Sequence, residues 1–229
     1  YVPWSKFTKI LTNHHHIMSD TDTLYESILC GKPLPALDAT RAAVTSGAAP
    51  GDIIHDHMIR AMEEVGRRFE QGKAFVPELL MAAQAMKKCL EFLKPLLKED
   101  ESIQAGRIIV GTVKGDLHDI GKNLVASMLE GCGFEIVNLG TNVSSEQFVA
   151  AVREHKADIL GMSALLTTTM PYMQEVVAAL EAEGLRNSIK IMIGGAPVTE
   201  EFARTIGADG FSPNANAAVS LARSLVQSA

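Results

Sequence analysis

The sequence predicts an α/β protein in two parts, a bundle of four helices followed by a five-stranded parallel sheet. Two observations carry this prediction. Apolar residues recur at helical spacing from Asp20 to Leu97, with no strand-like run among them. From Arg107 onward, short apolar runs alternate with helical stretches five times. That alternation is typical of a parallel sheet covered by helices on both faces.

The N-terminal part divides into four helical runs, each closed by a residue that ends helices. The first three runs end at Gly31, Gly47 and Gly72, and the fourth ends at the charged stretch that begins at Lys98. Helices joined by such short loops are usually antiparallel neighbours. We therefore expect these four helices to form one compact bundle.

Five apolar runs predict the strands of the second part. They are Ile108–Val113, Phe134–Leu139, Ile159–Ser163, Ile189–Gly195 and Gly210–Phe211. Five strands favour the flavodoxin-like order of a doubly wound, Rossmann-like sheet over the six-stranded dinucleotide-binding order. Open sheets of this kind bind ligands at the carboxyl ends of their strands, so we expect the functional site there.

The first seventeen residues differ in character from the rest. Met18 begins a stretch that resembles a natural start, and the three consecutive histidines before it are typical of a vector-encoded tail. The predicted organisation therefore has four segments: a vector-derived tail at 1–17, the helical bundle at 18–98, a linker at 99–105 and the sheet domain at 106–229.

Composition excludes several functional classes. The 229 residues include 21 Lys and Arg against 27 Asp and Glu, a net charge of −6, and only 5% are aromatic. A nucleic-acid interface needs a basic patch and commonly stacking side chains, so we expect no nucleic-acid partner. The three cysteines lie far apart, and no apolar run approaches the roughly 18 residues of a membrane span. These features predict a reduced, cytoplasmic protein without a membrane anchor.

The glycine-rich loop after the first strand carries Asp116, His118 and Asp119. It does not match a phosphate-binding P-loop, because its glycines are too widely spaced and asparagine follows the lysine where Ser or Thr would bind magnesium. Zinc is disfavoured, since no cysteine or second histidine lies nearby. A carboxylate two positions before a histidine can hydrogen-bond one ring nitrogen and orient the other toward a metal. The alternative is an exposed or locally hydrogen-bonded histidine; a metal held by His118 alone must bring its other ligands with it.

Three motifs, in order along the chain, resemble the signature of cobalamin-binding domains of the methionine synthase type. They are D-x-H-x-x-G at Asp116, His118 and Gly121, S-x-L at Ser163 and Leu165, and the glycine pair Gly194 and Gly195. The bundle also resembles the helical cap of that family, with the pattern V-G-x-x-F-x-x-G-K-x-F-x-P at residues 65–77. The resemblance covers residues 20–226 and extends to the free-standing corrinoid proteins of methyltransferase systems.

The resemblance implies a cobalamin cofactor bound base-off/His-on, with His118 replacing the cofactor's own benzimidazole as the lower ligand of cobalt. Asp116 would hold the imidazole, and Thr169, which matches a serine of methionine synthase, would complete the relay. The other implied cofactor contacts are Asp119, Gly121, Ser163, Leu165, Thr167, Gly194 and Gly195, with Phe69 and Val76 shielding the upper face of cobalt.

The function implied by the resemblance is that of a carrier subunit rather than a stand-alone enzyme. A methyl group would travel on cobalt from a substrate-specific methyltransferase to a second methyltransferase with a thiol or tetrahydrofolate acceptor. A corrinoid-reactivating protein is a further expected partner. Because the cap must move aside for these partners, we expect a hinge at Lys98–Gln104. The alternative is a B12-dependent sensor module without its output domain, whereas the small subunit of a carbon-skeleton mutase would lack the cap.

Overall fold

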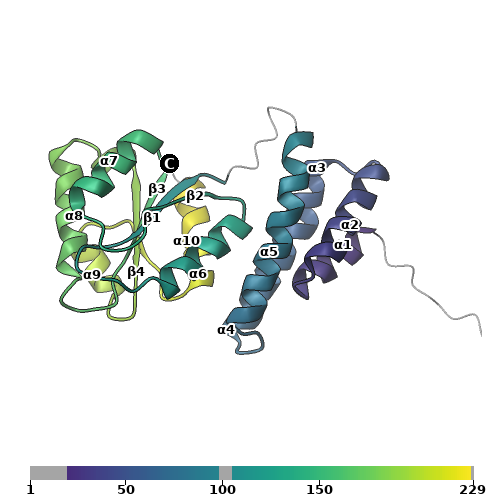
Figure 1. Ribbon diagram of the computed structural model, residues 1–229, viewed down its shortest axis with the longest axis horizontal. Helices are drawn as coiled ribbons and strands as arrows, with labels where there is room; N and C mark the ends of the chain where they lie inside the picture. Colours follow the sequence, from purple (N-terminus) through teal and green to yellow (C-terminus); the bar gives the residue numbers. More distant parts are fainter. Residues whose placement is uncertain (1–19, 98–104, 228–229) are drawn as a thin grey trace, which may run out of the picture.

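The computed structural model describes residues 20–97 and 105–227 and shows a helical part beside an α/β part (Figure 1). The predicted tail at 1–17 and the predicted hinge at Lys98–Gln104 lie outside the described residues. Within the described ranges, no helix has the length and apolar content needed to cross a membrane.

The helical part consists of four helical segments. They are α1 (Asp20–Leu29), α2 (Pro33–Thr45), a continuous run through α3 (Pro50–Asp52), the π-helical η2 (Ile53–Ile59) and α4 (Arg60–Glu70), and α5 (Val76–Leu93) with its 3-10 extension η3 (Lys94–Leu96). Gly31, in the turn after α1, has a φ of +61°, and a Cβ there would come within 2.5 Å of Met81 Cβ. The turn therefore packs directly against α5 because it carries a glycine.

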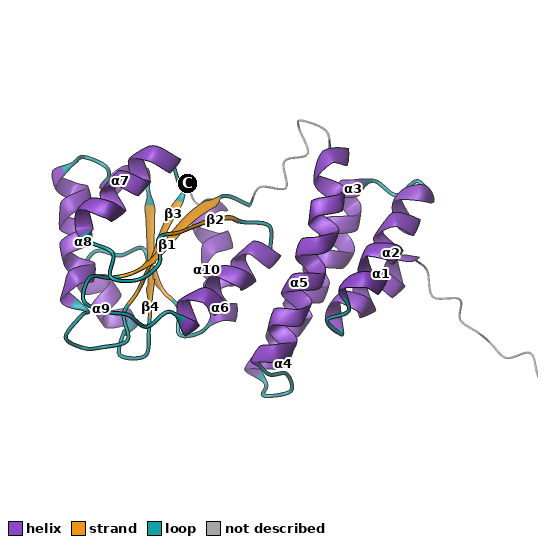
Figure 2. Cartoon of the chain, viewed as in Figure 1, coloured by secondary structure: helices purple, strands orange, loops and turns teal. Residues whose placement is uncertain are grey.

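The second part contains a five-stranded sheet in which every pairing is parallel (Figure 2). Its strands are β1 (Arg107–Thr112), β2 (Glu135–Asn138), β3 (Ile159–Ser163), β4 (Lys190–Gly194) and β5 (Gly210–Phe211). The order is β2-β1-β3-β4-β5, so the predicted flavodoxin-like topology is confirmed. The register places Val110, Gly161 and Met192 side by side across the three central strands. Two residues further along each strand, toward the carboxyl ends, Thr112, Ser163 and Gly194 form a second row.

Helices cover the sheet on both faces. They are α6 (Ile120–Gly131), α7 (Ser145–His155), α8 (Pro171–Ala182), α9 (Glu200–Thr205) and α10 (Ala215–Gln227), with the 3-10 turn η4 (Arg186–Ser188) before β4. One face packs against α7, α8 and α9, and the other against α6 and α10. The bundle lies on the outer side of α6 and α10, as Figure 1 shows.

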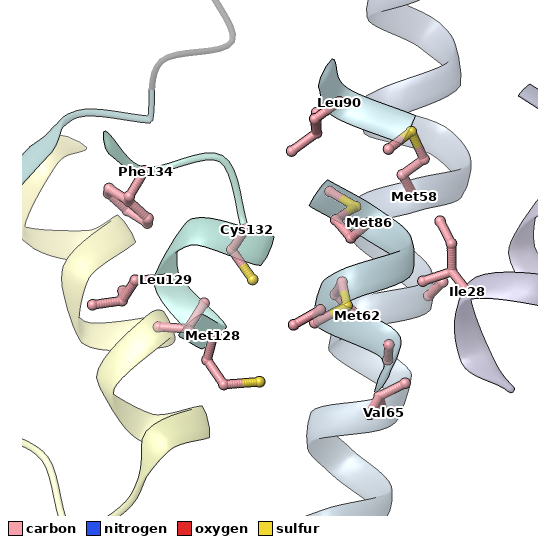
Figure 3. Packing of buried hydrophobic residues seen from close by; sticks show 14 of the residues in the cluster. Ile28, Met58, Met62, Val65, Met86, Leu90, Met128, Leu129, Cys132 and Phe134 are labelled. Carbon is pink, nitrogen blue, oxygen red and sulfur yellow. The ribbon is translucent and has the colours of Figure 1, made fainter. Parts of the chain in front are cut away.

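The bundle shares a hydrophobic core with the α6/α10 face of the sheet. Figure 3 shows this core, with Met128 and Leu129 of α6 on the sheet side and Met62 and Met86 on the bundle side. Three polar contacts bridge the same interface, joining Lys87 Nζ to Glu130 Oε2 at 2.9 Å, Arg223 to Glu63 at 2.9 Å and Asn216 to Glu70 at 2.7 Å. The helical part is thus packed against the α/β part rather than merely tethered to it.

Candidate functional site

A cavity of about 540 Å³ opens at the carboxyl ends of the central strands, between α6 and α10. We call it the slot. Its inner end is formed by Val110, Gly161 and Met192, which the sheet register aligns. His118 and Ser163 lie at its outer end, where the strands finish. The slot therefore occupies the place where doubly wound sheets bind ligands.

Asp116 is fully buried beside the outer end of the slot, and its carboxylate is hydrogen-bonded to residues of two loops. Its Oδ1 accepts the His118 backbone N–H at 3.0 Å and lies 2.7 Å from His118 Nδ1. Its Oδ2 accepts from Leu165 N at 2.7 Å and from Thr169 Oγ1 at 2.9 Å. The structure thus brings together the three residues of the predicted relay, from the loops after β1 and β3.

Burial by itself would raise the pKa of Asp116, but the hydrogen bonds outweigh it. Donors from Leu165, His118 and Thr169 favour the charged form, and the pKa of Asp116 lies well below its ordinary value. An ionised carboxylate requires a proton on the facing His118 Nδ1. In the neutral imidazole, the Nε2 lone pair is then left for a ligand.

Neighbouring loops fix the position of this relay. Gly115 has a φ of +81°, a conformation that favours glycine, and its N–H donates to Asn142 Oδ1 at 2.8 Å. Asn142 N in turn donates to the Asp116 carbonyl at 3.0 Å, and Thr112 Oγ1 donates to the His118 carbonyl at 2.9 Å. The backbone from Gly115 to His118 is therefore held by Thr112 at the end of β1 and by Asn142 in the loop after β2.

Apolar side chains surround the imidazole, whose side chain is 52% exposed. Leu117 is 74% exposed and Ile120 is 87% exposed, and both line the slot together with Leu165. Exposed apolar groups gathered around one free ring nitrogen are suited to a flat, apolar ligand. A corrin ring fits this donor set, because it would bring nitrogen ligands for its own cobalt and would need only one ligand from this site, the imidazole of His118.

The remaining predicted site residues divide into two groups. Those that line the slot are Phe69, Asp119, Gly121, Ser163, Leu165, Gly194 and Gly195. Two do not line it: Val76, which is exposed at the start of α5, and Thr167, which is exposed in the loop after β3. Phe69 is the lining residue contributed by the bundle.

Backbone packing explains the glycines at the end of β4, in addition to the cofactor contact expected from the sequence. Gly195 has a φ of +134°, and a Cβ there would come within 1.8 Å of the Ala164 carbonyl oxygen. A Cβ on Gly194 would come within 3.0 Å of the Ser212 carbonyl oxygen. The close approach of these backbones requires glycine at residue 195 whatever the slot contains.

Sequence reasoning missed several residues of the slot. Lys122 is buried, and its Nζ donates to Asn123 Oδ1 at 2.8 Å and to Asn138 Oδ1 at 2.6 Å. Burial lowers the pKa of Lys122, with a smaller opposing effect from Asp119. Gly161 was also missed, although a glycine inside a strand is a recognised signal of close approach by a ligand or another chain.

A doubly wound sheet with an oriented histidine at the mouth of an apolar slot defines a protein that binds a flat metal-containing cofactor. Comparison with known families makes this specific. The model of the B12 binding domain matches residues 106–221, and a second B12 binding domain model matches residues 21–94. The chain belongs to the B12-binding domain family and, within it, to the corrinoid proteins.

Relatives support this placement over most of their length. Dimethylamine corrinoid protein 1 of Methanosarcina acetivorans is 45% identical over 193 residues, which cover 82% of this chain and 91% of that protein. A corrinoid protein of Desulfitobacterium hafniense is 38% identical over 213 residues, covering 92% of this chain and 99% of that protein.

Two solved structures are similar as well. A cobalamin-binding protein from Desulfitobacterium hafniense has 33% identity and a TM-score of 0.77, over 90% of this chain and 98% of that one. A chain in the methanol:cobalamin methyltransferase complex of Methanosarcina barkeri has 26% identity and a TM-score of 0.78, over 100% of this chain and 94% of that one. Both the bundle and the α/β part therefore have counterparts in these proteins.

Proposed function

We propose that this protein carries a methyl group on a bound corrinoid between two methyltransferases. The observation that supports this most strongly is the relay of His118, Asp116 and Thr169 at the mouth of the slot. It presents one imidazole nitrogen, held by a buried carboxylate, amid exposed apolar side chains. The names of the relatives, which include dimethylamine and trimethylamine corrinoid proteins, support the same function.

In this proposal His118 Nε2 is the protein's ligand to cobalt, and Asp116 fixes the ring through Nδ1. When bound, cobalamin supplies the cobalt centre that takes up and releases the methyl group. Asp116 keeps its charge across the neutral pH range because its pKa is lowered, so the proton of the pair stays on Nδ1. Thr169 donates to Asp116 Oδ2 and limits its movement.

The slot would receive the nucleotide tail that His118 displaces from cobalt. Gly121 and Ser163 line the path into it, and a Cβ on Gly121 would meet nothing within 4 Å. Leu117 and Ile120 would cover the lower side of the ring. Phe69 is the bundle residue proposed to shield the cofactor, whereas Val76 contacts it only if the ring extends beyond the slot.

The proposed partners are a substrate-specific methyltransferase, an acceptor methyltransferase that uses a thiol or tetrahydrofolate, and a reactivating protein. Methylated amines and methanol are the donor classes to test first, because they appear in the names of similar proteins. In this proposal the partner determines which methyl donor is used, since the relay would contact the corrinoid and not the donor.

Transfer of an isotopically labelled methyl group tests the function. The protein is loaded with hydroxocobalamin, reduced, and mixed with labelled donor, with and without a purified methyltransferase for that donor. Label should co-elute with the protein only when the methyltransferase is present. His118→Ala should reduce this labelling strongly, whereas the control His155→Ala, at the far end of α7, should not. Equal labelling without any methyltransferase, or full labelling of His118→Ala, would contradict the proposal.

A further inference from the structure

The inner end of the slot is shaped by a glycine in the middle of the central strand. Gly161 pairs with Val110 on β1 and Met192 on β4, and it remains partly exposed within the sheet because it faces the slot. A Cβ built on it would lie 3.3 Å from Val110 Cγ1 and 3.8 Å from Met192 Cγ. A methyl group there needs only a small shift, so protein packing does not by itself demand glycine. Its missing side chain instead deepens the slot.

The polar side chains that line the slot lie toward its outer end, and its inner end is lined by apolar residues. The polar ones come from the carboxyl ends of strands and from helix starts: His118, Asp119, Lys122, Ser163, Ser212 and Asn214. The middle of the strands and the later turns of α6 contribute Val110, Met192, Leu124, Val125 and Leu129. Backbone groups beside Gly161 are paired within the parallel ladder. Among the described lining residues, the inner end therefore offers no side-chain hydrogen-bond partner.

We propose that this inner end selects the corrinoid by the base on its nucleotide tail, and this inference rests on the function proposed above. A flat base with apolar edges, such as a benzimidazole, matches Val110, Gly161 and Met192. A purine base would bring an amine and additional ring nitrogens into a region with no partner for them. Leaving such groups buried and unpaired weakens binding, so the protein discriminates against purine-containing corrinoids.

Binding of three corrinoids to the cofactor-free protein tests the proposal. They are cobalamin with its dimethylbenzimidazole, the analogue with adenine in that place, and cobinamide, which has no base. Dissociation constants are obtained by equilibrium dialysis, with the corrin absorbance as the readout. Cobalamin should bind best, with the adenine analogue about tenfold to a hundredfold weaker. Equal affinity for the two, or tighter binding of the adenine analogue, would overturn the inference.

Two variants test whether the inner end of the slot causes the difference in affinity between cobalamin and the adenine analogue. Met192→Gln keeps a side chain of similar length and places an amide at the inner end. It should therefore reduce the difference between the dissociation constants of cobalamin and the adenine analogue. Gly161→Ala should weaken both of these corrinoids and leave cobinamide unchanged. Ile191→Val, which belongs to the core on the opposite face of the sheet, is the matched control and should change no affinity. Unaltered discrimination in Met192→Gln, together with unaltered binding by Gly161→Ala, would also overturn the inference.

The binding series separates this inference from the proposed function. If cobalamin binds through His118 and exceeds the adenine analogue, both stand. If cobalamin and the adenine analogue bind equally while His118→Ala weakens both, only the selection of the base is wrong. If none of the three corrinoids binds, the proposed function and the inference fail together.

Discussion

The two faces of the sheet are built on the same strands but differ in what fills the space beside them. Two glycines on neighbouring strands show this difference. On the face covered by α7, α8 and α9, the space above Gly111 is filled by the ring of Phe148, which lies 2.7 Å from the position of a Cβ. On the face covered by α6 and α10, the space above Gly161 opens into the slot. The first face is closed by the protein, and the second is left to be completed by a ligand.

This difference shows why a helical part accompanies the sheet domain. The slot opens on this face at the carboxyl ends of the strands, and its lining includes the exposed side chains Leu117 and Ile120. The bundle core adjoins the outer sides of these helices and forms one continuous cluster with them. Covering by the bundle therefore stabilises the open face without filling the slot.

The largest loss of stability is expected when the Phe148 ring is removed from the face covered by α7, α8 and α9. Phe148 is fully buried, so Phe148→Ala should lower the free energy of unfolding by about 3–5 kcal/mol. Leu124→Ala, on the slot side, should cost less stability and weaken corrinoid binding instead. Denaturant unfolding and corrinoid dialysis on both variants measure the two effects. If Phe148→Ala weakened corrinoid binding in the folded protein more than Leu124→Ala, the division between the faces would be wrong.

The buried carboxylate of Asp116, at the carboxyl ends of the strands, should have the next largest effect on stability. Asp116→Asn should lower the free energy of unfolding at neutral pH by about 2–3 kcal/mol, because buried donors lose a charged acceptor. The folded-state pKa lies below the ordinary 3.8, so the stabilisation is present above that pH and is lost as the pH falls toward the folded value.

The pH dependence of unfolding tests this sign directly. Wild-type protein should lose stability as the pH drops below about 4, and Asp116→Asn should lose less over the same interval. Asp56→Asn, which alters an exposed carboxylate of the bundle, is the control and should follow the wild type. An acid dependence in Asp116→Asn as steep as that of the wild type would contradict the role assigned to the carboxylate.

Alanine at Gly111 and at Gly161 should have different effects on stability, because the two faces of the sheet are packed differently. Gly111→Ala places a methyl group against the Phe148 ring and should cost about 1–3 kcal/mol of stability. Gly161→Ala meets looser surroundings and should change stability by less than about 1 kcal/mol. Thermal or urea unfolding of both variants provides the test. Equal destabilisation would mean that the two faces are packed alike.

The smallest effect is expected at the surface of the interface between the two parts. Lys87 and Glu130 form an exposed pair between α5 and α6, and Lys87→Ala should cost at most about 1 kcal/mol. The cost should shrink further at high salt, since screening weakens exposed pairs. A larger loss of stability that does not change with salt would contradict the view of Lys87 and Glu130 as a weak, solvent-screened pair.

Most of the fold could be predicted from the sequence, because each strand is an apolar run and each helix carries its own periodicity. The run Ile159–Ser163 agrees with β3 at both ends. Strand order also followed, since five alternating units favour one doubly wound arrangement. These features are local, or depend on rules that hold for the whole class.

The site was only partly predictable. Asp116 and His118 stand two residues apart, so their hydrogen bond could be expected from a single loop. The inner end of the slot could not, because the exposure of Gly161 depends on Val110 and Met192, which lie far from it in the sequence. The position of the bundle against α6 and α10 likewise depends on contacts between distant segments.

We propose that the open face receives a corrinoid whose cobalt is bound by His118. Electron paramagnetic resonance of the cobalamin-loaded protein in its Co(II) state tests it most directly, using protein made with ordinary or ¹⁵N-labelled histidine. We expect a nitrogen splitting that changes with the label and is lost in His118→Ala. A splitting that does not change with the label would show that the cofactor's own benzimidazole still binds cobalt and that His118 does not.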